Sequence, residues 1–347
     1  MTQVKRSQLI GPLLRDVSRS FYLTLRVLPA TLRPAISLAY LLARASDTIA
    51  DTKVVPRDKR RAHLVRFREQ FESRYDPDEL VIIRSDLAQH QSLPAEKLLL
   101  EKLDDCFVML ALLPEDDRAR IAELLGVITR GQENDLVQFP GETEKELAAF
   151  ETDQQLDDYT YAVAGCVGKF WTEMCVAHLP ALRGWDRATM TALGIRFGKG
   201  LQLTNILRDI PKDLRIARCY LPRQRLAEAG LKPEDLLAPA TMSRFRPVYD
   251  RHLDLTLDHF DAAWRYTLAI PRSCARLRLA CLWPIFIGLK TLALLRRSQD
   301  VLDPSKRIMV AQRDVNHMLV KSVVFCRSNK VLDAWFQKLR SEAARKD

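Results

Sequence analysis

The chain has 347 residues, of which 47% are hydrophobic and 28% are charged, a composition that excludes a disordered or fibrous protein. The net charge of +10 suits nucleic acid, an anionic membrane or a phosphorylated ligand as partner. Nucleic acid is disfavoured because the chain has neither zinc-finger spacing nor an evident recognition helix. Seven cysteines without a CxxC pair predict reduced thiols and a cytoplasmic protein.

Apolar residues recur at helical spacing through most of the chain, with Pro and acidic residues at the breaks. Residues 81–85 are the only strand-like run, and 210–240 is expected to be a loop with short helices. Neither GxGxxG nor a P-loop is present, which disfavours a nucleotide-binding parallel sheet. We therefore expect a single all-α domain spanning 1–347. Its expected helices are 12–28, 32–51, 57–75, 95–113, 115–138, 146–180, 186–209, 243–268, 271–297 and 314–341.

Two segments of the chain bear on membrane targeting or insertion. The start of the chain, MTQVKRSQLIGPLLRD, lacks the long apolar core of a signal peptide. The longest apolar run, residues 279–295, contains Pro284 and Lys290. A membrane span is one interpretation of this run, but its length and content favour a buried core helix, so no transmembrane segment is expected.

Two expected helices each carry a pair of aspartates four residues apart. In 32–51, Asp47 and Asp51 follow Tyr40 and Arg44 on one helical face. The second helix reads GKGLQLTNILRDIPKDLR, residues 198–215. On one of its faces lie Gln202, Asn205, Asp209 and Asp213.

Paired carboxylates next to arginines indicate magnesium and diphosphate. Mg²⁺ typically takes one or two carboxylates and completes its shell with water and phosphate oxygens. Arginine adds forked donors to phosphate oxygens. A solvated helix face is the alternative for either pair alone, and acid–base work on a glycosidic bond is another. The six histidines show no HExxH spacing, which disfavours zinc.

Four motifs in order resemble the squalene and phytoene synthases, which join two isoprenoid diphosphates. The resemblance runs from about Ser18 to about Gln312. It rests on SRSFYLTLRVLP (18–29), YLLARASDTIAD (40–51), DDYTYAVAGCVG (157–168) and GLQLTNILRDIPKDLRIARCYLP (200–222). It implies an isoprenoid-synthase-type helical bundle around a central apolar cavity.

The resemblance also implies roles for individual residues. Asp47, Asp51, Asp209 and Asp213 would bind Mg²⁺ that bridges to diphosphate. Phe21, Tyr40 and the catalytic Tyr159 would line the reaction centre. The diphosphates would be held by Ser18, Arg19, Ser20, Arg44, Gln202, Asn205, Arg208 and Arg218.

The second aspartate pair departs from a regular helix. Pro211 lies between Asp209 and Asp213 and removes the N–H that would bond the Leu207 carbonyl. We therefore expect the helix to kink or end at Pro211. Ala50 and Lys212 stand where some relatives carry acids.

Family members differ in how the reaction ends, and the chain most resembles squalene synthases. The segment 278–295 has their pattern of Pro followed by TLA, and Lys306 and Arg307 lie near their basic pair for NADPH phosphates. The favoured reaction converts two farnesyl diphosphates to squalene with NADPH. The alternatives are phytoene or dehydrosqualene formation, and presqualene diphosphate or hydroxysqualene formation. A non-catalytic binding or assembly protein should have lost aspartates, and here all four are present.

The basic C-terminal helix, 314–341, is amphipathic. Its apolar face carries Val331, Leu332, Trp335, Phe336 and Leu339. Such a face either lies on an anionic membrane or docks on the bundle, so peripheral membrane contact is one hypothesis for this cytoplasmic protein.

Overall fold

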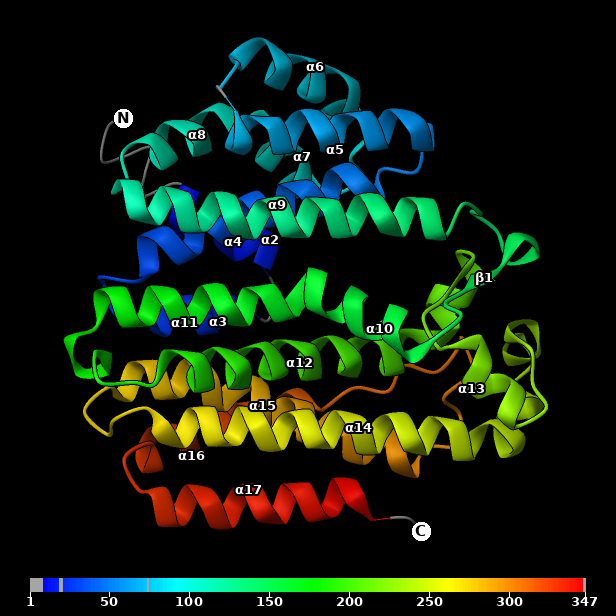
Figure 1. The fold of residues 1–347 in the computed structure, drawn as a ribbon. Coiled ribbons are helices and arrows are strands. Elements are labelled where there is room, and N and C mark those ends of the chain that lie inside the picture. The colour runs from blue at the N-terminus through cyan, green and yellow to red at the C-terminus, as the bar shows by residue number, and fades with distance from the viewer. Residues whose placement is uncertain (1–8, 19–20, 74, 346–347) are drawn as a thin grey trace. The chain divides into compact units, whose positions relative to one another are not determined.

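The computed structural model describes residues 9–18, 21–73 and 75–345 (Figure 1). These fall into two compact units. Unit 1 comprises residues 1–136 and 170–183, and unit 2 comprises residues 137–169 and 184–347. Both units are almost entirely helical, which confirms the expected all-α class. A single domain spanning 1–347 stays a prediction.

Unit 1 is built around α4 (Arg33–Asp51), which packs against α2, α3, α5, α7 and α8. Leu38, Leu42 and Ile49 are fully buried on one face of α4, as their helical spacing requires. The other helices of this unit are α2 (Leu14–Ser18), α3 (Tyr22–Val27), α5 (Arg57–Glu72), α6 (Pro77–Leu87), α7 (Pro94–Glu101), α8 (Leu103–Ala111), α9 (Glu115–Gln138) and most of α11 (Cys166–His178).

The strand-like run at 81–85 was predicted wrongly, because it lies inside α6. Asp76 caps this helix by accepting a hydrogen bond from the Asp78 backbone N–H, and Pro77 occupies its first position. Leu80 and Ile83 are buried while Val81 is 46% exposed, so burial follows a helical and not an alternating pattern.

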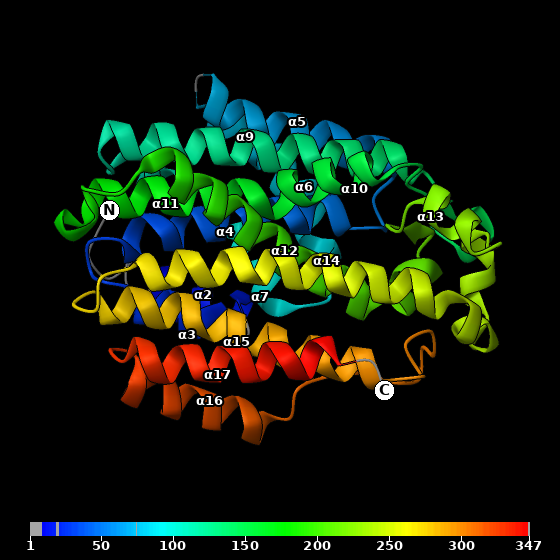
Figure 2. The same ribbon diagram turned by 60° about the horizontal axis from the view of Figure 1, so that its bottom comes forward.

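Unit 2 centres on the paired long helices α12 (Arg187–Arg215) and α14 (Met242–Ala269), which lie side by side in both ribbon views (Figures 1 and 2). One short parallel strand pair among the described residues joins β1 (Ala148–Ala149), which precedes α10, to β2 (Arg218–Cys219), which follows the end of α12. The remaining elements are α10 (Asp153–Thr160), the π-helical segment η5 (Tyr161–Gly165), α13 (Arg223–Glu228), α15 (Ala275–Arg297), α16 (Gln312–Phe325) and α17 (Asn329–Ala344).

The helix α12 does not end at Pro211, as one form of the prediction held, but continues to Arg215. The Leu207 carbonyl, which Pro211 cannot satisfy, accepts a hydrogen bond of 3.1 Å from the buried Tyr249 hydroxyl of α14. A neighbouring helix thus supplies the donor that proline removes, and α12 can carry Asp213 in helical register with Asp209.

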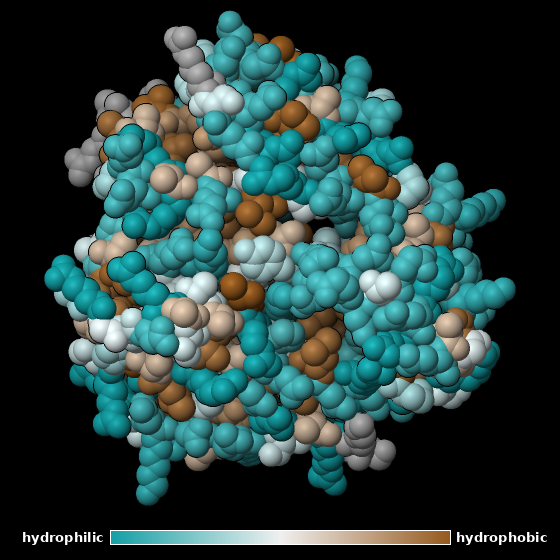
Figure 3. Space-filling model, in the orientation of Figure 1, coloured by the Kyte–Doolittle hydropathy of each residue, from teal (hydrophilic) through white to brown (hydrophobic). Residues whose placement is uncertain are grey.

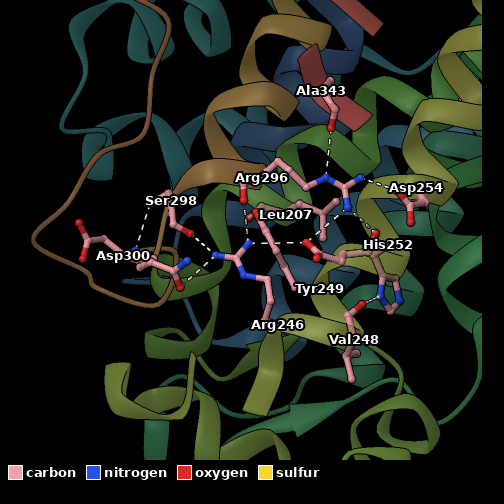
Figure 4. A network of polar contacts seen from close by, with 12 residues as sticks. Leu207, Arg246, Val248, Tyr249, His252, Asp254, Arg296, Ser298, Asp300 and Ala343 are labelled. Atoms are coloured by element: carbon pink, nitrogen blue, oxygen red, sulfur yellow. Dashed lines mark hydrogen bonds and ion pairs between the residues drawn. The ribbon is translucent and has the colours of Figure 1, made fainter. Parts of the chain in front are cut away.

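A buried arginine network ties three helices of unit 2 together (Figure 4). The Arg296 side chain of α15 donates to the Ala343 carbonyl of α17 at 3.1 Å and pairs with Asp254 of α14. Its neighbour Arg246 donates to the Arg296 carbonyl at 3.2 Å. Because Arg296 is 5% exposed, its charge needs these partners.

The helix α15 is confirmed as a core helix of unit 2. It is the one helix of the described residues that is long and apolar enough to cross a membrane, and 72% of its apolar window is buried in the protein. It packs against α12, α14, α16 and α17.

Four expected helices are split into shorter ones: 12–28, 95–113, 146–180 and 314–341. The last becomes α16 and α17, with α17 capped by the Ser328 hydroxyl.

Leu332, Trp335 and Phe336 of α17 are buried against α14 and α15, so this apolar face docks on the bundle. Of the two alternatives for this face, the structure shows docking on the bundle, and peripheral membrane contact of the protein stays a prediction. The molecular face in Figure 3 is mostly hydrophilic, with apolar residues scattered over it.

Candidate active site

The first acidic face lies on α4 in unit 1. Tyr40, Arg44, Asp47 and Asp51 occupy the less buried side of that helix, as their spacing predicts. The Arg44 guanidinium lies 3.5 Å from the Asp47 carboxylate and also pairs with Glu96 of α7. Burial alone would lower the pKa of Arg44, but Asp47 and Glu96 outweigh it and raise the pKa. Arg44 is therefore a fixed positive charge beside the aspartates.

Asp47 is the electrostatically perturbed member of this face. The carboxylate is partly withdrawn from water, and this desolvation, together with the nearby negative charge of Asp51, raises the pKa of Asp47 to about 6, although Arg44 opposes the shift. The side chain keeps 46% of its surface accessible, so a ligand can reach the carboxylate. Because the negative charges of Asp47 and Asp51 repel each other, a cation bound between them would be favourable.

Gln132 is a residue of this site that sequence reasoning missed. It lies on α9, and its side-chain amide donates a hydrogen bond of 2.7 Å to Asp47 Oδ1. Gln132 is 8% exposed, so the amide is held in place by packing. No motif pointed to it, because the contact joins residues 85 positions apart.

The N-terminal substrate segment is described only in part. Phe21 stacks on Tyr40, with ring centroids 5.4 Å apart and an interplanar angle of 23°. These two rings therefore lie together, and their role in lining the reaction centre stays a prediction. Ser18 is buried and its hydroxyl donates to the Leu14 carbonyl, while Arg19 and Ser20 lie outside the described residues.

The second acidic face lies on α12 in unit 2. Gln202, Asn205, Asp209 and Asp213 share one helix, and Asn205 is exposed. Asp209 is bound by its neighbour Arg208, whose Nε and Nη2 donate to the two carboxylate oxygens at 2.9 and 2.7 Å. The hydrogen bonds that Arg208 donates to Asp209 raise the pKa of Arg208, so this side chain also stays charged.

Asp213 and Arg218 line a small pocket at the end of α12. Ile206 and Tyr220 lie in the same wall. The Arg218 guanidinium donates to the Tyr220 hydroxyl at 3.5 Å. A carboxylate, a guanidinium and an aromatic ring therefore share one pocket in unit 2.

Tyr159 of α10 joins this group through stacking. Its ring lies 4.7 Å from that of Tyr220 at an interplanar angle of 19°. Tyr220, like Gln132, was missed by sequence reasoning, although it lies within the fourth motif. The pair belongs to an apolar cluster with Phe139, Phe150 and Leu203. Tyr159 is thus held beside the pocket that contains Asp213 and Arg218.

Lys306 and Arg307 lie in the segment between α15 and α16, and both are exposed. Hydrogen bonds from Ser305 lower the pKa of the nearby Asp303, and weaker contributions come from Lys306 and from Arg215 of α12. The segment is therefore close enough to the end of α12 for the charges to interact. Two exposed cations suit the phosphates of NADPH, and this role stays a prediction.

The two aspartate pairs suit Mg²⁺, which shares its ligands with phosphate and water, better than a metal that is bound by protein side chains alone. No group of three or more His, Cys, Asp or Glu side chains forms a metal site among the residues that the structure describes. Each acidic face offers two aspartates, which is the number Mg²⁺ commonly takes when phosphate oxygens and water complete its shell. The like charges of Asp47 and Asp51 are the observation that supports this fit.

Residues 14–314 match the profile of squalene/phytoene synthase. The chain belongs to this family. It is 28% identical over 257 residues to a bifunctional lycopene cyclase/phytoene synthase of Gibberella fujikuroi, covering 72% of this chain and 41% of that protein. It is 27% identical over 217 residues to the presqualene diphosphate synthase of Zymomonas mobilis, covering 62% of this chain and 60% of that protein.

A solved structure shows the same fold. The complex of TcSQS with the ligand BPH1237 matches with a TM-score of 0.75 over 98% of both chains, at 18% identity. The expected isoprenoid-synthase-type helical fold is thereby confirmed. The chain spans half or less of the length of the first bifunctional relatives that it matches.

Proposed function

We propose that the protein is a Mg²⁺-dependent prenyltransferase that joins two isoprenoid diphosphates head to head. The observation that carries this proposal is the pair of acidic faces, each with an arginine against its first aspartate, in a chain of the squalene/phytoene synthase family. One arginine lies 3.5 Å from its aspartate and the other makes two hydrogen bonds, so each face would combine metal ligands with a phosphate donor.

In this mechanism the chain's own residues bind diphosphate and protect a cation. Arg44 and Arg208 would take up negative charge on the departing diphosphate, because both stay protonated at all working pH values. Bound Mg²⁺ would neutralise the same charge as the C–O bond breaks. Asp47, Asp51, Asp209 and Asp213 would hold it, and Arg208 would have to share Asp209.

The aromatic residues have a separate task. Phe21 with Tyr40, and Tyr159 with Tyr220, are stacked pairs whose ring faces can stabilise an allylic cation. Tyr159 also offers a hydroxyl for proton transfer. The surrounding apolar residues would exclude water, which would otherwise quench the cation.

The favoured substrate is farnesyl diphosphate, converted through presqualene diphosphate to squalene with a hydride from NADPH. Lys306 and Arg307 would contact the phosphates of that cofactor. The names of the relatives favour a second outcome, which is phytoene or presqualene diphosphate formation without a hydride. Both outcomes use the same metal and diphosphate chemistry.

Product analysis separates these outcomes. Purified protein would receive farnesyl or geranylgeranyl diphosphate with Mg²⁺, with and without NADPH, and products would be identified by gas chromatography, after dephosphorylation for diphosphates. Squalene formed only with NADPH supports the favoured reaction. Dehydrosqualene, phytoene, hydroxysqualene or presqualene diphosphate under all conditions would move the protein to another branch. If neither farnesyl nor geranylgeranyl diphosphate gave a product, the proposed activity would be contradicted.

A further inference from the structure

The outer face of α16 exposes three valines in a row along the helix. Val320, Val323 and Val324 are 67%, 54% and 67% exposed. The opposite face holds the helix in place, because Met318 and Ser322 are buried. The Ser322 hydroxyl accepts a hydrogen bond of 2.8 Å from the Trp283 indole of α15. The orientation of the valines toward solvent is therefore fixed by packing on the other side.

The helix lies at an edge of unit 2. It packs on α15 and α17, and Figure 2 shows it as the outermost helix beside α17. It runs antiparallel to α15, since Trp283 of α15 contacts Ser322 of α16, and the chain after α16 then reaches Asn329, the first residue of α17, which contacts the earlier Arg278. The surface at this edge is thus a single exposed helix with the segments that flank it.

Basic residues surround the valines. Residues 304–330 contain six Lys or Arg and one acid, Asp314, which is half-buried. Arg313 lies on the valine side two helical turns before Val320, and Arg327 lies in the turn that follows the end of α16 at Phe325. Both arginines are exposed, as are Lys306, Arg307 and Lys330. An apolar strip with cations at both ends is complementary to lipid tails beneath anionic headgroups.

A protein partner fits this surface less well. Stable protein–protein interfaces bury roughly 1,200–2,000 Å² in total, and three valines provide only a small part of such an area. A bilayer needs only shallow insertion of apolar side chains when several cations reach the headgroups. The small size and the charge of this face therefore favour a lipid surface.

We propose that the outer face of α16 docks the protein on an anionic lipid bilayer. Val320, Val323 and Val324 enter the headgroup region, and Arg313, Arg327 and Lys330 contact lipid phosphates. The proposal is independent of the product that the enzyme forms. It also differs from the expectation for α17, whose apolar face is used inside the protein.

Vesicle sedimentation with the full chain tests this proposal. Vesicles would consist of phosphatidylcholine alone, or of seven parts phosphatidylcholine to three parts phosphatidylglycerol. We expect binding to the anionic vesicles only, and we expect it to weaken as salt rises from about 0.1 M to about 0.5 M. The double variant Val320→Asp/Val324→Asp should lose at least tenfold in apparent affinity. Arg313→Gln/Arg327→Gln should reduce both the affinity and its salt dependence.

The matched control is Val81→Asp, which adds a negative charge at a valine of α6 that is 46% exposed. It should bind vesicles as the unchanged protein does. The softer variant Val320→Ser/Val324→Ser, with circular dichroism spectra for all variants, separates lost binding from misfolding. Equal sedimentation of the unchanged protein and Val320→Asp/Val324→Asp would overturn the proposal. So would loss of a dimer in that variant, measured without lipid, because α16 would then be an interface between copies.

Discussion

The Asp47 carboxylate has a raised pKa, which has a cost for the stability of the fold. Its pKa is raised to about 6 by burial and by Asp51. A carboxyl group whose folded pKa lies above its unfolded value of 3.8 binds its proton more tightly in the folded state. It therefore opposes folding above pH 6, and this penalty disappears as the pH falls from about 6 toward 4.

Replacing Asp47 by Asn should remove this penalty. Without Mg²⁺, at pH 7.5, we expect Asp47→Asn to unfold at a higher temperature than the unchanged protein, with the difference shrinking toward pH 4.5. Thermal unfolding followed by circular dichroism in a chelating buffer measures this. Asp58→Asn, at a carboxylate that is 94% exposed, is the control and should show no such trend. A less stable Asp47→Asn at pH 7.5 would disprove this reading of the charges.

Gln132 should set the metal affinity of the same carboxylate. Gln132→Leu removes the 2.7 Å hydrogen bond to Asp47, and a lost bond to a charged group is worth about 1.5 kcal/mol, or about tenfold in affinity. We expect about tenfold more Mg²⁺ to be needed for half-maximal activity and for the Mg²⁺-induced rise in unfolding temperature. High Mg²⁺ should restore the rate.

The control for this variant is Gln154→Leu, which alters an exposed glutamine of α10 that bonds Asp158. Its Mg²⁺ dependence should match that of the unchanged protein. If Gln132→Leu lowers the rate equally at every Mg²⁺ concentration, Gln132 does not act through the metal ligand.

At the scale of elements, the sequence predicted the helices well where apolar spacing was regular. The helices α4, α9, α14 and α15 lie close to their expected ranges. One error, the end of α12, occurred where a distant contact decided the outcome. The Tyr249 hydroxyl bonds the Leu207 carbonyl and so keeps α12 helical beyond Pro211. No local sequence pattern could predict this donor, because it lies 42 residues from Leu207.

The pairing of Tyr249 with Leu207 can be tested by a double-mutant cycle. Tyr249→Phe should cost about 1–3 kcal/mol of unfolding free energy, because it leaves a buried carbonyl without its donor. In a Pro211→Ala background, the restored N–H can bond Leu207, so the same substitution should cost about 1 kcal/mol less. Urea denaturation measures both values. Equal costs in the two backgrounds would show that Tyr249 does not compensate for Pro211.

At the scale of the whole molecule, the order of four motifs predicted the family and the fold. This was possible because each motif is a continuous stretch of the chain and can be read directly from the sequence. The residues Gln132 and Tyr220 could not be predicted, since their roles depend on which helices pack together. For the same reason, the sequence could not predict that α16 and α17 place their apolar residues differently. Both segments are amphipathic, and only packing shows that α17 buries its apolar face while α16 exposes three valines.

The most direct test of the account is the release of diphosphate from farnesyl diphosphate, measured with and without Mg²⁺ in one experiment. The comparison includes Asp47→Asn, Asp209→Asn and the control Asp58→Asn. We predict Mg²⁺-dependent release by the unchanged protein and the control, and at least a hundredfold loss in each of the other two variants, with the folds retained. Undiminished release by either Asp47→Asn or Asp209→Asn would contradict the assignment of metal and diphosphate chemistry to the two acidic faces.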